Sequence, residues 1–474
     1  MDTFRRTSQI QTSDSGTGEL PPDVSHRAGR TSLLESSTAW ARAIDKSYSL
    51  DSFDLGRTIG VGRYARVRTA KVKDNHSLPV CLKILKKSNM KELDQVQHVI
   101  AEKQVLATIQ NPFVIQLLTT FQDDSRLYMV LELINGGELF HELRKAKRFT
   151  LDRAKFYNME VVSAVSYLHS LLIAYRDLKP ENILLHRTGH IKLTDFGFAK
   201  YLKGQRTYTV CGTAAYMAPE IVMRQGHGLA VDWWAVGILM YEMLSGNVPF
   251  DDKGADYDEK VVFAAIVNGN PSYPPAWSID KNYRSVQDYL KRLIMVDPIR
   301  RMGCREAVEA FGKTKHVKDH ALFKGVNWND VAQGVITPPF RPNTNDSDTD
   351  ISCFQQFEES DAAARASAVD DDEVYADWET RNSFEDEARQ KAADLVREFE
   401  GRRSQRASAH GGDRGPPGLT APPAEDITGV AGAAEGPGAQ GEAQEPGARA
   451  EKQPAVKEVC DAKVAGSGAC CAVQ

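Results

Sequence analysis

The sequence predicts an α+β fold of two lobes, a small lobe of strands that holds one main helix and a larger lobe that is mainly helical. The stretch from Phe53 to Lys73 is rich in β-branched residues and is broken by Gly60 and Gly62, which indicates two strands joined by a glycine turn. Short apolar runs at 80–85 and 127–133 indicate two further strands. The small lobe is therefore expected to consist mainly of strands.

Helical periodicity accounts for the rest of the folded region. Apolar residues recur at helical spacing between Val96 and Leu106, which predicts the helix of the small lobe. Beyond the pair Gly136–Gly137, an amphipathic helix is expected around 156–168 and an almost wholly apolar one at 236–244. The second lobe is therefore expected to be mainly helical.

The two ends of the chain differ from this region in composition. Residues 1–38 are rich in Ser, Thr, Gly and Asp and are expected to form a mobile arm. After Phe340 polar residues dominate, and we expect isolated aromatic residues to anchor an extended strap: Phe354, Phe357, Tyr375 and Trp378. A short helix and linker are expected at 379–410, where Ser383 and Asp386 resemble a capping box. Residues 411–474 are expected to be disordered.

Charge and composition narrow the function classes. The net charge of -5 gives no basic footprint, so nucleic acid is not expected as a partner. No apolar stretch approaches the roughly 18 residues of a membrane span, and the start lacks the apolar segment of a signal peptide, so a cytoplasmic enzyme body is expected. The seven cysteines contain no CxxC pair and are expected to be reduced.

A glycine turn and a strand lysine suggest phosphate binding. Gly60 and Gly62 lie at the predicted turn, where backbone amides can approach phosphate oxygens. Taken alone, an ordinary hairpin with two glycines explains them equally well. Lys83 on a later strand and Glu102 on the following helix could orient a triphosphate, although a lone strand lysine is usually solvated.

The decisive segment runs from Tyr175 to Asn182 and is followed by Asp195-Phe196-Gly197 and then by Ala218-Pro219-Glu220. Asp177 and Asn182 are a carboxylate and an amide five residues apart, and Asp195 adds a second carboxylate 18 residues after the first. They supply a proton acceptor and two hard oxygen ligands for magnesium. The lysine between them, at 179, can neutralise a moving phosphoryl group. The order of these blocks is hard to reproduce by accident.

These motifs resemble those of the eukaryotic protein kinase family. The resemblance implies the two-lobed protein kinase fold, with a small antiparallel β lobe, and transfer of phosphate from ATP to protein serine or threonine, with Mg²⁺ as the second cofactor. It implies that Asp177 accepts the substrate hydroxyl proton and that Lys179 steadies the γ-phosphate. It further implies that Asn182 and Asp195 hold magnesium, and that Lys83, paired with Glu102, grips the α and β phosphates.

The resemblance also implies where the nucleotide lies. Backbone groups at Glu132 and Ile134 are implied to contact adenine, and the remaining nucleotide-binding residues are implied to be Gly60, Val61, Gly62, Ala65, Val67, Lys83 and Leu184. Two residues depart from the family pattern. The third glycine of the loop is Ala65, which could stiffen the loop, and the alanine two residues before Lys83 is Cys81.

From about Trp40 to Trp378 the chain resembles the AGC group of kinases, and within it the catalytic subunit of cyclic-AMP-dependent protein kinase. The motifs that carry this similarity are Tyr175-Arg176-Asp177, Gly197-Phe198-Ala199-Lys200, Thr209-Val210-Cys211-Gly212-Thr213 and Pro339-Phe340-Arg341-Pro342. The implied divisions are an N-terminal helix segment at 39–52, a kinase domain at 53–323 and an AGC C-terminal tail at 324–378. Within the domain they are a small lobe at 53–131, a hinge at 132–135 and a large lobe at 136–323.

The similarity implies activation by phosphorylation. Thr209 is the implied phosphothreonine, with His98, Arg176 and Lys200 as its basic partners. A phosphate group orders a loop when cations converge on it. The alternative is an unmodified surface threonine.

The similarity also implies a substrate preference and a partner. Glu138, Glu181 and Glu242 match positions that hold arginines before the target hydroxyl, which implies Arg-Arg-x-Ser/Thr motifs, and an apolar pocket for the residue after the target is implied at Val210, Ala214 and Met217. The sequence Thr213-Ala214-Ala215-Tyr216 lacks one acidic residue of the family. A separate cyclic-nucleotide-binding regulatory subunit is implied, although Tyr208 replaces the tryptophan that docks it in the relative.

Two alternatives remain open. One is another AGC kinase, such as a cyclic-GMP-dependent type, but no cyclic-nucleotide-binding domain is visible in the sequence. The other is a pseudokinase scaffold, which the presence of Lys83, Asp177 and Asp195 disfavours.

Both termini carry candidate modification sites. Arg5-Arg6-Thr7-Ser8 fits the implied consensus and predicts autophosphorylation at Ser8, with a basic solvated end as the alternative. Cys471-Ala472-Val473-Gln474 resembles a prenylation box, and Cys470 could take palmitate, so membrane contact through lipid is expected unless the cysteine occurs there by chance.

Overall fold

The computed structural model describes residues 48–62, 65–73, 79–90, 93–202, 205–251, 258–304, 316–345 and 349–359, together with Tyr375 and Trp378. The predicted arm, most of the helix segment at 39–52, the predicted helix and linker at 379–410, and the final segment at 411–474 lie outside the described residues. So do Ser8, Cys470 and Cys471, and the modifications expected there stay predictions.

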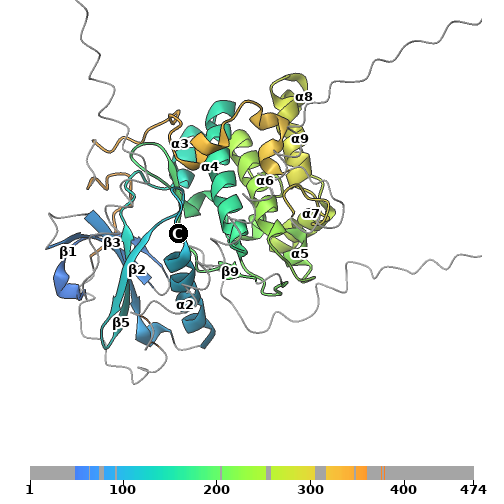
Figure 1. The fold of residues 1–474 in the computed structure, drawn as a ribbon. Coiled ribbons are helices and arrows are strands. Elements are labelled where there is room, and N and C mark those ends of the chain that lie inside the picture. The colour runs from blue at the N-terminus through green and yellow to red at the C-terminus, as the bar shows by residue number, and fades with distance from the viewer. Residues whose placement is uncertain are drawn as a thin grey trace, which may run out of the picture.

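The protein has the two expected lobes, and the small lobe is built on a five-stranded antiparallel sheet with α2 beside it (Figure 1). The strand order is β1-β2-β3-β5-β4. The elements are β1 (Phe53–Val61), β2 (Ala65–Val72), β3 (Pro79–Lys86), α2 (Leu93–Thr108), β4 (Leu117–Gln122) and β5 (Arg126–Glu132). Strand β4 was not among the predicted strands, because most of its side chains are only half-buried and it has no clear apolar run.

Strand β3 sorts its side chains onto two faces of the sheet. Val80 and Leu82 join an aromatic cluster in which the rings of Phe121 and Tyr128 stack with centroids 4.4 Å apart. Cys81 belongs to the main core on the other face. Because successive side chains of a strand point to opposite faces, Lys83 shares the face of Cys81 and is directed toward α2.

The large lobe is mainly helical, as predicted. Its helices are α3 (Leu139–Ala146), α4 (Leu151–Ser170), α5 (Pro219–Val222), α6 (Ala230–Ser245), α7 (Glu259–Asn268), α8 (Pro275–Ile279), α9 (Tyr283–Leu293) and α11 (Trp328–Ala332). The two helices expected from periodicity correspond to α4 and α6, which pack against each other (Figure 1). Helix α4 begins after Thr150, whose side chain accepts a hydrogen bond from the backbone of Arg153, and α6 ends at Gly246 in the left-handed conformation.

Short strands and 3-10 turns make up the other described elements. Strand β6 (Ile173–Ala174) pairs with β9 (Lys200–Tyr201), and β7 (Ile183–Leu185) pairs with β8 (Ile191–Leu193). The 3-10 turns are Leu50–Ser52, Lys87–Asn89, Pro180–Asn182, Ala214–Tyr216, Val317–Asp319 and Ala321–Phe323. These elements of two or three residues are too short to show a period, so sequence analysis did not predict them.

The described part of the tail returns to the small lobe. Tyr375 and Trp378 are buried, as expected for anchoring residues. The Trp378 indole N–H donates to the carbonyl oxygens of Phe121 at 3.0 Å and Tyr128 at 3.3 Å. A buried indole needs such an acceptor, so these bonds fix where the tail lies on the sheet.

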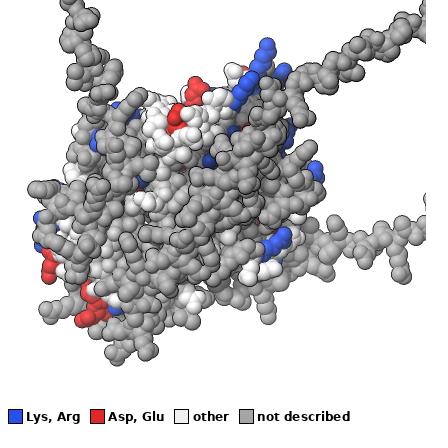
Figure 2. Space-filling view, in the orientation of Figure 1, with Lys and Arg blue, Asp and Glu red and all other residues white. Residues whose placement is uncertain are grey.

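Cysteines and surface charges complete the description. Cys81, Cys211 and Cys353 are free thiols. On the face seen in Figure 2, the described Lys, Arg, Asp and Glu side chains are scattered and do not form one patch of a single sign. Within the described ranges, every helix is too short or too polar to cross a bilayer.

Candidate active site

Three of the predicted catalytic residues form one hydrogen-bonded group. The Asn182 side-chain amide donates to the Asp177 carboxylate and to its backbone carbonyl, both at 2.8 Å. The Lys179 ammonium lies 3.1 Å from Asp177 Oδ2 and donates to the Thr213 hydroxyl at 2.9 Å. Thr213 in turn donates to Asp177 Oδ1 at 3.1 Å. Both oxygens of the Asp177 carboxylate thus have partners that orient them, and both Asp177 and Asn182 are buried.

Asp232 holds the backbone of this loop, a role that sequence analysis missed. Its carboxylate accepts hydrogen bonds from the backbone N–H groups of Tyr175 at 2.9 Å and Arg176 at 2.8 Å, and it contacts His169 at 2.8 Å. Arg176 has a φ of 68°, which a residue with a side chain adopts only when its surroundings enforce it. Asp232 lies in the first turn of the apolar helix α6, and a buried charge in such a helix is the signal that could have found it.

The pairing of β7 with β8 brings the two predicted magnesium ligands to one edge of the loop. Asn182 directly precedes β7, Asp195 follows β8, and the Thr194 N–H donates to the Asn182 carbonyl at 3.0 Å. Asp195 also has a positive φ, 56°, and its Oδ1 accepts a bond from the Gly197 N–H at 3.3 Å. Because the Asn182 amide nitrogen donates to Asp177, its oxygen remains as a ligand for a hard cation.

Lys83 and Glu102 form the predicted ion pair. The ammonium lies 2.6 and 2.8 Å from the two carboxylate oxygens, and the side chains are 18% and 6% exposed. Burial works against the charge of Lys83, but the charges of Glu102 and Asp195 outweigh it and raise the pKa of the lysine. Lys83 is therefore a fixed cation beside Asp195.

The glycine turn leaves room for a phosphate. A Cβ added at Gly60 would meet Val67 no closer than 3.7 Å, and one at Gly62 would meet the Ala65 carbonyl at 3.6 Å. Among the described residues, packing therefore does not require either glycine, and neither has a positive φ. A group approaching from outside the chain is a sufficient reason for their missing side chains, so the loop fits a nucleotide phosphate. Val61 is exposed on the same turn.

The predicted hinge residues lie where β5 ends. Glu132 is the last residue of β5, and Ile134 is buried two residues later. Leu184, on β7, is half-buried and forms a backbone bridge with Glu138 at the start of the large lobe. These residues therefore lie where the chain passes from the small lobe to the large lobe.

Of the three predicted substrate-binding carboxylates, Glu181 acts electrostatically on the other two. Burial raises the pKa of Glu138, and the charge of Glu181 adds to the rise, while the charge of His141 opposes it. Burial also raises the pKa of Glu242, against the effects of Tyr216 and Arg144, and Glu181 again adds to the rise. At both carboxylates, the charge of Glu181 therefore acts in the same direction as burial.

Glu242 already has partners within the chain. The Arg144 guanidinium donates to its Oε1 at 2.7 Å, and the Tyr216 hydroxyl donates to its Oε2. The carboxylate is 2% exposed, whereas Arg144 is about half-exposed. Arg144 was not predicted, and it holds this carboxylate in place.

The predicted activation residues are only partly brought together. Thr209 is exposed, and no hydrogen bond between described residues joins it to His98, Arg176 or Lys200. Arg176 donates through Nε to the Phe198 carbonyl at 2.8 Å, while its buried Nη1 has no partner among the described residues. Lys200 donates to the Thr207 hydroxyl at 3.1 Å, and His98 is exposed on α2, which contacts the strand that carries Lys200.

The three residues predicted to line the apolar pocket differ in how far they are exposed. Val210 is 43% exposed, whereas Ala214 and Met217 are buried. Gly212, between them, has a φ of 102°, and a Cβ there would lie 2.7 Å from the Arg176 carbonyl. This glycine therefore lets the segment approach the catalytic loop closely. A shared pocket for the three residues stays a prediction.

A further contact from the tail holds the first strand of the glycine hairpin. Glu359 accepts hydrogen bonds from the Thr58 backbone N–H at 2.5 Å and from the Thr58 hydroxyl at 2.9 Å. Arg66 donates to the same hydroxyl at 3.1 Å, and Arg68 lies 3.8 Å from Glu359. Sequence analysis missed this clamp, because 301 residues separate its partners and no local pattern links them.

Acid is expected to destabilise the protein partly through His186. The ring lies at the turn after β7, where Nδ1 accepts a bond from the Thr188 backbone N–H at 3.3 Å. Burial, and then the charges of Lys192, Arg187 and His190, lower the pKa of His186 to about 3. In the unfolded chain the ring binds a proton below about pH 6.5. The unfolded state then holds more protons, so stability is lost as the pH falls from about 6.5 toward 3.

We expect His186→Gln to lessen the fall in the free energy of unfolding between pH 7 and pH 5. The difference from the unaltered protein should be up to about 2 kcal/mol, and smaller to the extent that water reaches the half-buried ring. Urea denaturation at both pH values measures it, with His141→Gln, at an exposed histidine, as the control. The same pH dependence in His186→Gln and in the unaltered protein would contradict the assignment.

Comparison with known proteins identifies the family. The profile of the protein kinase domain matches residues 53–311. The chain is 43% identical over 326 residues to the cAMP-dependent protein kinase catalytic subunit PRKX of Mus musculus. The matched region covers 69% of this chain and 87% of the relative. It is 41% identical over 315 residues to cAMP-dependent protein kinase type 3 of Saccharomyces cerevisiae, and this match covers 66% of this chain and 75% of the relative. With the geometry above, these similarities show that the chain belongs to the protein kinase family, as an ATP-dependent serine/threonine kinase of the AGC group.

Proposed function

We propose that this kinase phosphorylates serine or threonine in Arg-Arg-x-Ser/Thr motifs. The observation that carries the proposal is the group formed by Glu138, Glu181 and Glu242, in which burial, and to a smaller extent the charge of Glu181, raise the pKa of Glu138 and Glu242. A guanidinium beside Glu181 and Glu138 would relieve their repulsion and form charge-assisted hydrogen bonds, whereas Glu242, which already accepts bonds from Arg144 and Tyr216, would contribute its charge. Glu181 lies four residues after Asp177, so bound arginines would lie close to the reacting hydroxyl.

The nucleotide would lie between the glycine turn and the catalytic loop. When bound, ATP supplies the phosphoryl group and Mg²⁺ neutralises its charge. Lys83, oriented by Glu102, would bind the α and β phosphates, and Asn182 and Asp195 would hold the metal. The residues proposed to surround the rest of the nucleotide are Gly60, Val61, Gly62, Ala65, Val67, Glu132, Ile134 and Leu184.

Asp177 would accept the proton of the substrate hydroxyl. Its carboxylate is oriented by Asn182, Lys179 and Thr213, so it need not reorganise when the hydroxyl arrives. Lys179 would stay beside the transferred group as a compensating positive charge.

Phosphorylation of Thr209 would complete the site. The support is Arg176, whose buried Nη1 lacks a partner among the described residues, because a buried donor without an acceptor is costly. A phosphate on Thr209 could supply acceptor oxygens to Arg176, with Lys200 and His98 on neighbouring elements.

A separate regulatory subunit is part of the proposal. The curated relatives named above are called catalytic subunit and type 3 of a cAMP-dependent kinase, which suggests control from another chain. Tyr208 is 67% exposed, and its ring lies against Gly226, where a Cβ would come within 2.6 Å of it. We propose this ring as part of the docking surface for that subunit.

The specificity is tested with the full chain, phosphorylated at Thr209, and two peptides, Arg-Arg-x-Ser and Ala-Ala-x-Ser. We expect Glu181→Gln to lower kcat/KM for the arginine peptide by about 10- to 100-fold, because a charge-assisted hydrogen bond is weakened. The alanine peptide should change by about threefold or less. Glu259→Gln, at an exposed position on α7, is the matched control. An equal loss on both peptides would show that Glu181 does not read the arginine.

A further inference from the structure

A buried ion pair joins the start of the hinge to the strand that leads to Asp195. The Lys192 ammonium, on β8, lies 2.6 Å from Glu132 Oε1 and 3.4 Å from the Val114 carbonyl. The side chains are 4% and 18% exposed. Removing two charges from water is costly and is offset only by good geometry and additional hydrogen bonds.

Glu132 has those additional bonds. Its backbone N–H donates to the Gln116 carbonyl at 3.1 Å, and its Oε1 accepts a bond from the Gln116 N–H at 2.9 Å. The residue is thus attached on one side to Gln116, just before β4, and on the other side to Lys192 on β8. Both the backbone and the side chain of Glu132 are therefore bonded at the point where β5 ends.

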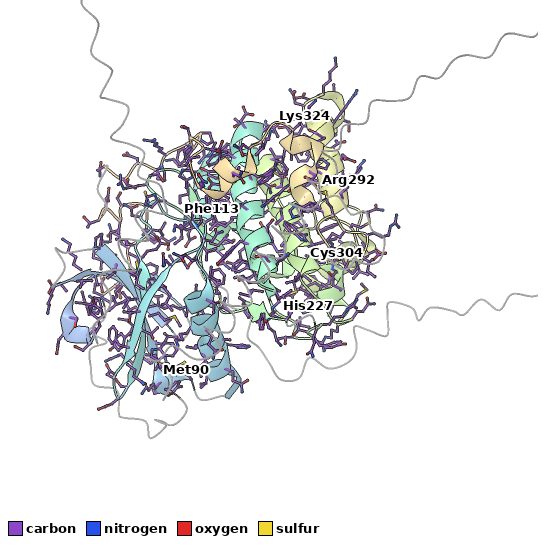
Figure 3. All side chains as sticks on the ribbon, viewed as in Figure 1. Met90, Phe113, His227, Arg292, Cys304 and Lys324 are labelled. Carbon is purple, nitrogen blue, oxygen red and sulfur yellow. The ribbon has the colours of Figure 1, made fainter. Side chains whose placement is uncertain are left out.

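Strand β8 is attached to the same region through its backbone. The Leu193 N–H donates to the carbonyl of Phe113, and the Ile115 N–H donates to the Leu193 carbonyl, both at 2.8 Å. Figure 3 shows Phe113 at the boundary between the lobes. Asp195 follows Lys192 by three residues, so a shift of β8 would move the proposed metal ligand.

The exit of the hinge is braced by the other strand of the same hairpin. The Gly136 N–H donates to the Leu185 carbonyl, and the Leu185 N–H donates to the Gly137 carbonyl, both at 2.8 Å. A Cβ at Gly136 would lie 2.4 Å from the Leu185 oxygen, so this approach requires glycine. The hinge is thus attached to β7 at its exit by the backbone and to β8 at its entry by one side-chain pair.

Lys192 supplies the positive charge beside Glu132. Burial, and then the charge of Glu132, raise the pKa of the nearby Cys81 thiol to about 12, so it stays neutral. His186, near Lys192, is also neutral at physiological pH because its pKa is lowered to about 3. Among the described residues, Lys192 is the cation within ion-pair distance of Glu132.

We propose that Lys192 is a positioning residue for the nucleotide. Its ion pair fixes the position of the hinge at Glu132 relative to Asp195. The proposal rests on the proposed function only in placing the nucleotide between these two points. A ligand that contacts the hinge with one end and the metal with the other binds best when their separation is fixed in advance. The pair would therefore affect nucleotide affinity more than the chemical step.

The test is Lys192→Met in the full chain. We expect the dissociation constant of Mg²⁺–ATP, measured by isothermal titration calorimetry, and the KM for ATP to rise by about tenfold or more, because a buried carboxylate loses its cation. At saturating ATP, kcat should stay within about threefold. A merely stabilising role would lower the melting temperature without this split between KM and kcat.

Two comparisons make the outcome decisive. Arg153→Met removes a pair of similar burial in the large lobe, where Arg153 lies 3.3 Å from Glu142, and should leave ATP affinity unchanged. Glu132→Gln should weaken ATP binding, and the double variant Lys192→Met/Glu132→Gln should bind no more weakly than Lys192→Met alone, because the two residues act as a unit. If Lys192→Met does not fold, Glu132→Gln alone carries the comparison with Arg153→Met.

The proposal is overturned if Lys192→Met binds Mg²⁺–ATP as the unaltered protein does, or if the two single effects multiply in the double variant. Calorimetry needs no peptide. If the protein binds Mg²⁺–ATP but shows no preference for the arginine peptide, the proposed specificity is refuted. The binding measurements on the variants would still test the role of Lys192.

Discussion

Asp177→Asn is expected to lower kcat by about 10²- to 10⁴-fold, the usual contribution of a positioned proton acceptor. The amide can keep an oxygen toward Asn182 and Lys179, whose contacts with Asp177 are 2.8 and 3.1 Å, so the loop should keep its shape. It cannot accept the proton of a substrate hydroxyl. Steady-state kinetics with the arginine peptide measures the loss, and calorimetry should show that Mg²⁺–ATP affinity changes by about threefold or less.

The control for this prediction is Asp280→Asn. Asp280 is exposed, and its Oδ1 accepts a bond from the Asn282 N–H at 2.9 Å, which an amide oxygen can replace. Its kcat should match that of the unaltered enzyme. A kcat for Asp177→Asn within about tenfold of the unaltered value would remove Asp177 from the role of proton acceptor.

Arg301→Met is expected to lower the free energy of unfolding by about 3–5 kcal/mol. Arg301 is completely buried and donates to both carboxylate oxygens of Glu220, at 2.7 and 2.9 Å. It also donates to the carbonyls of Ala230 and Met295, both at 2.9 Å. The substitution leaves Glu220 buried without its cation and removes the bonds to the two carbonyls. Chemical denaturation measures the change.

The matched control is Arg292→Met, on α9 (Figure 3). Arg292 lies 2.9 Å from Asp288, but both side chains are about half-exposed, so its loss should cost no more than about 1 kcal/mol. Equal losses for the two variants would show that burial of the Glu220 pair adds nothing to stability.

Local patterns in the sequence were sufficient for the main elements. The glycine turn between β1 and β2, the strand that carries Lys83 and the helices α4 and α6 all follow from apolar spacing and from Gly60 and Gly62. Strand β4 and the short strands β6 to β9 did not follow, because most β4 side chains are half-buried and the others have two or three residues.

Much of the site could also be predicted, because its motifs are short and their order is distinctive. Asp177 and Asn182 are five residues apart, and the turn at Pro180–Asn182 brings their side chains into contact. Lys83 and Glu102 were predicted as a pair from a strand and the helix that follows it. In each case residue type and local geometry together limited the arrangement.

The sequence by itself determined which elements form and which side chains bear the chemistry, since propensity, periodicity and motif order are properties of neighbouring residues. Only the tertiary structure decided that Asp232 holds the catalytic loop, that Glu359 clamps Thr58 and that Lys192 pairs with Glu132. Those partners are 56 to 301 residues apart. These carboxylates meet their donors only after segments far apart in the chain have packed together, and burial then strengthens the contacts of Asp232 and Glu132.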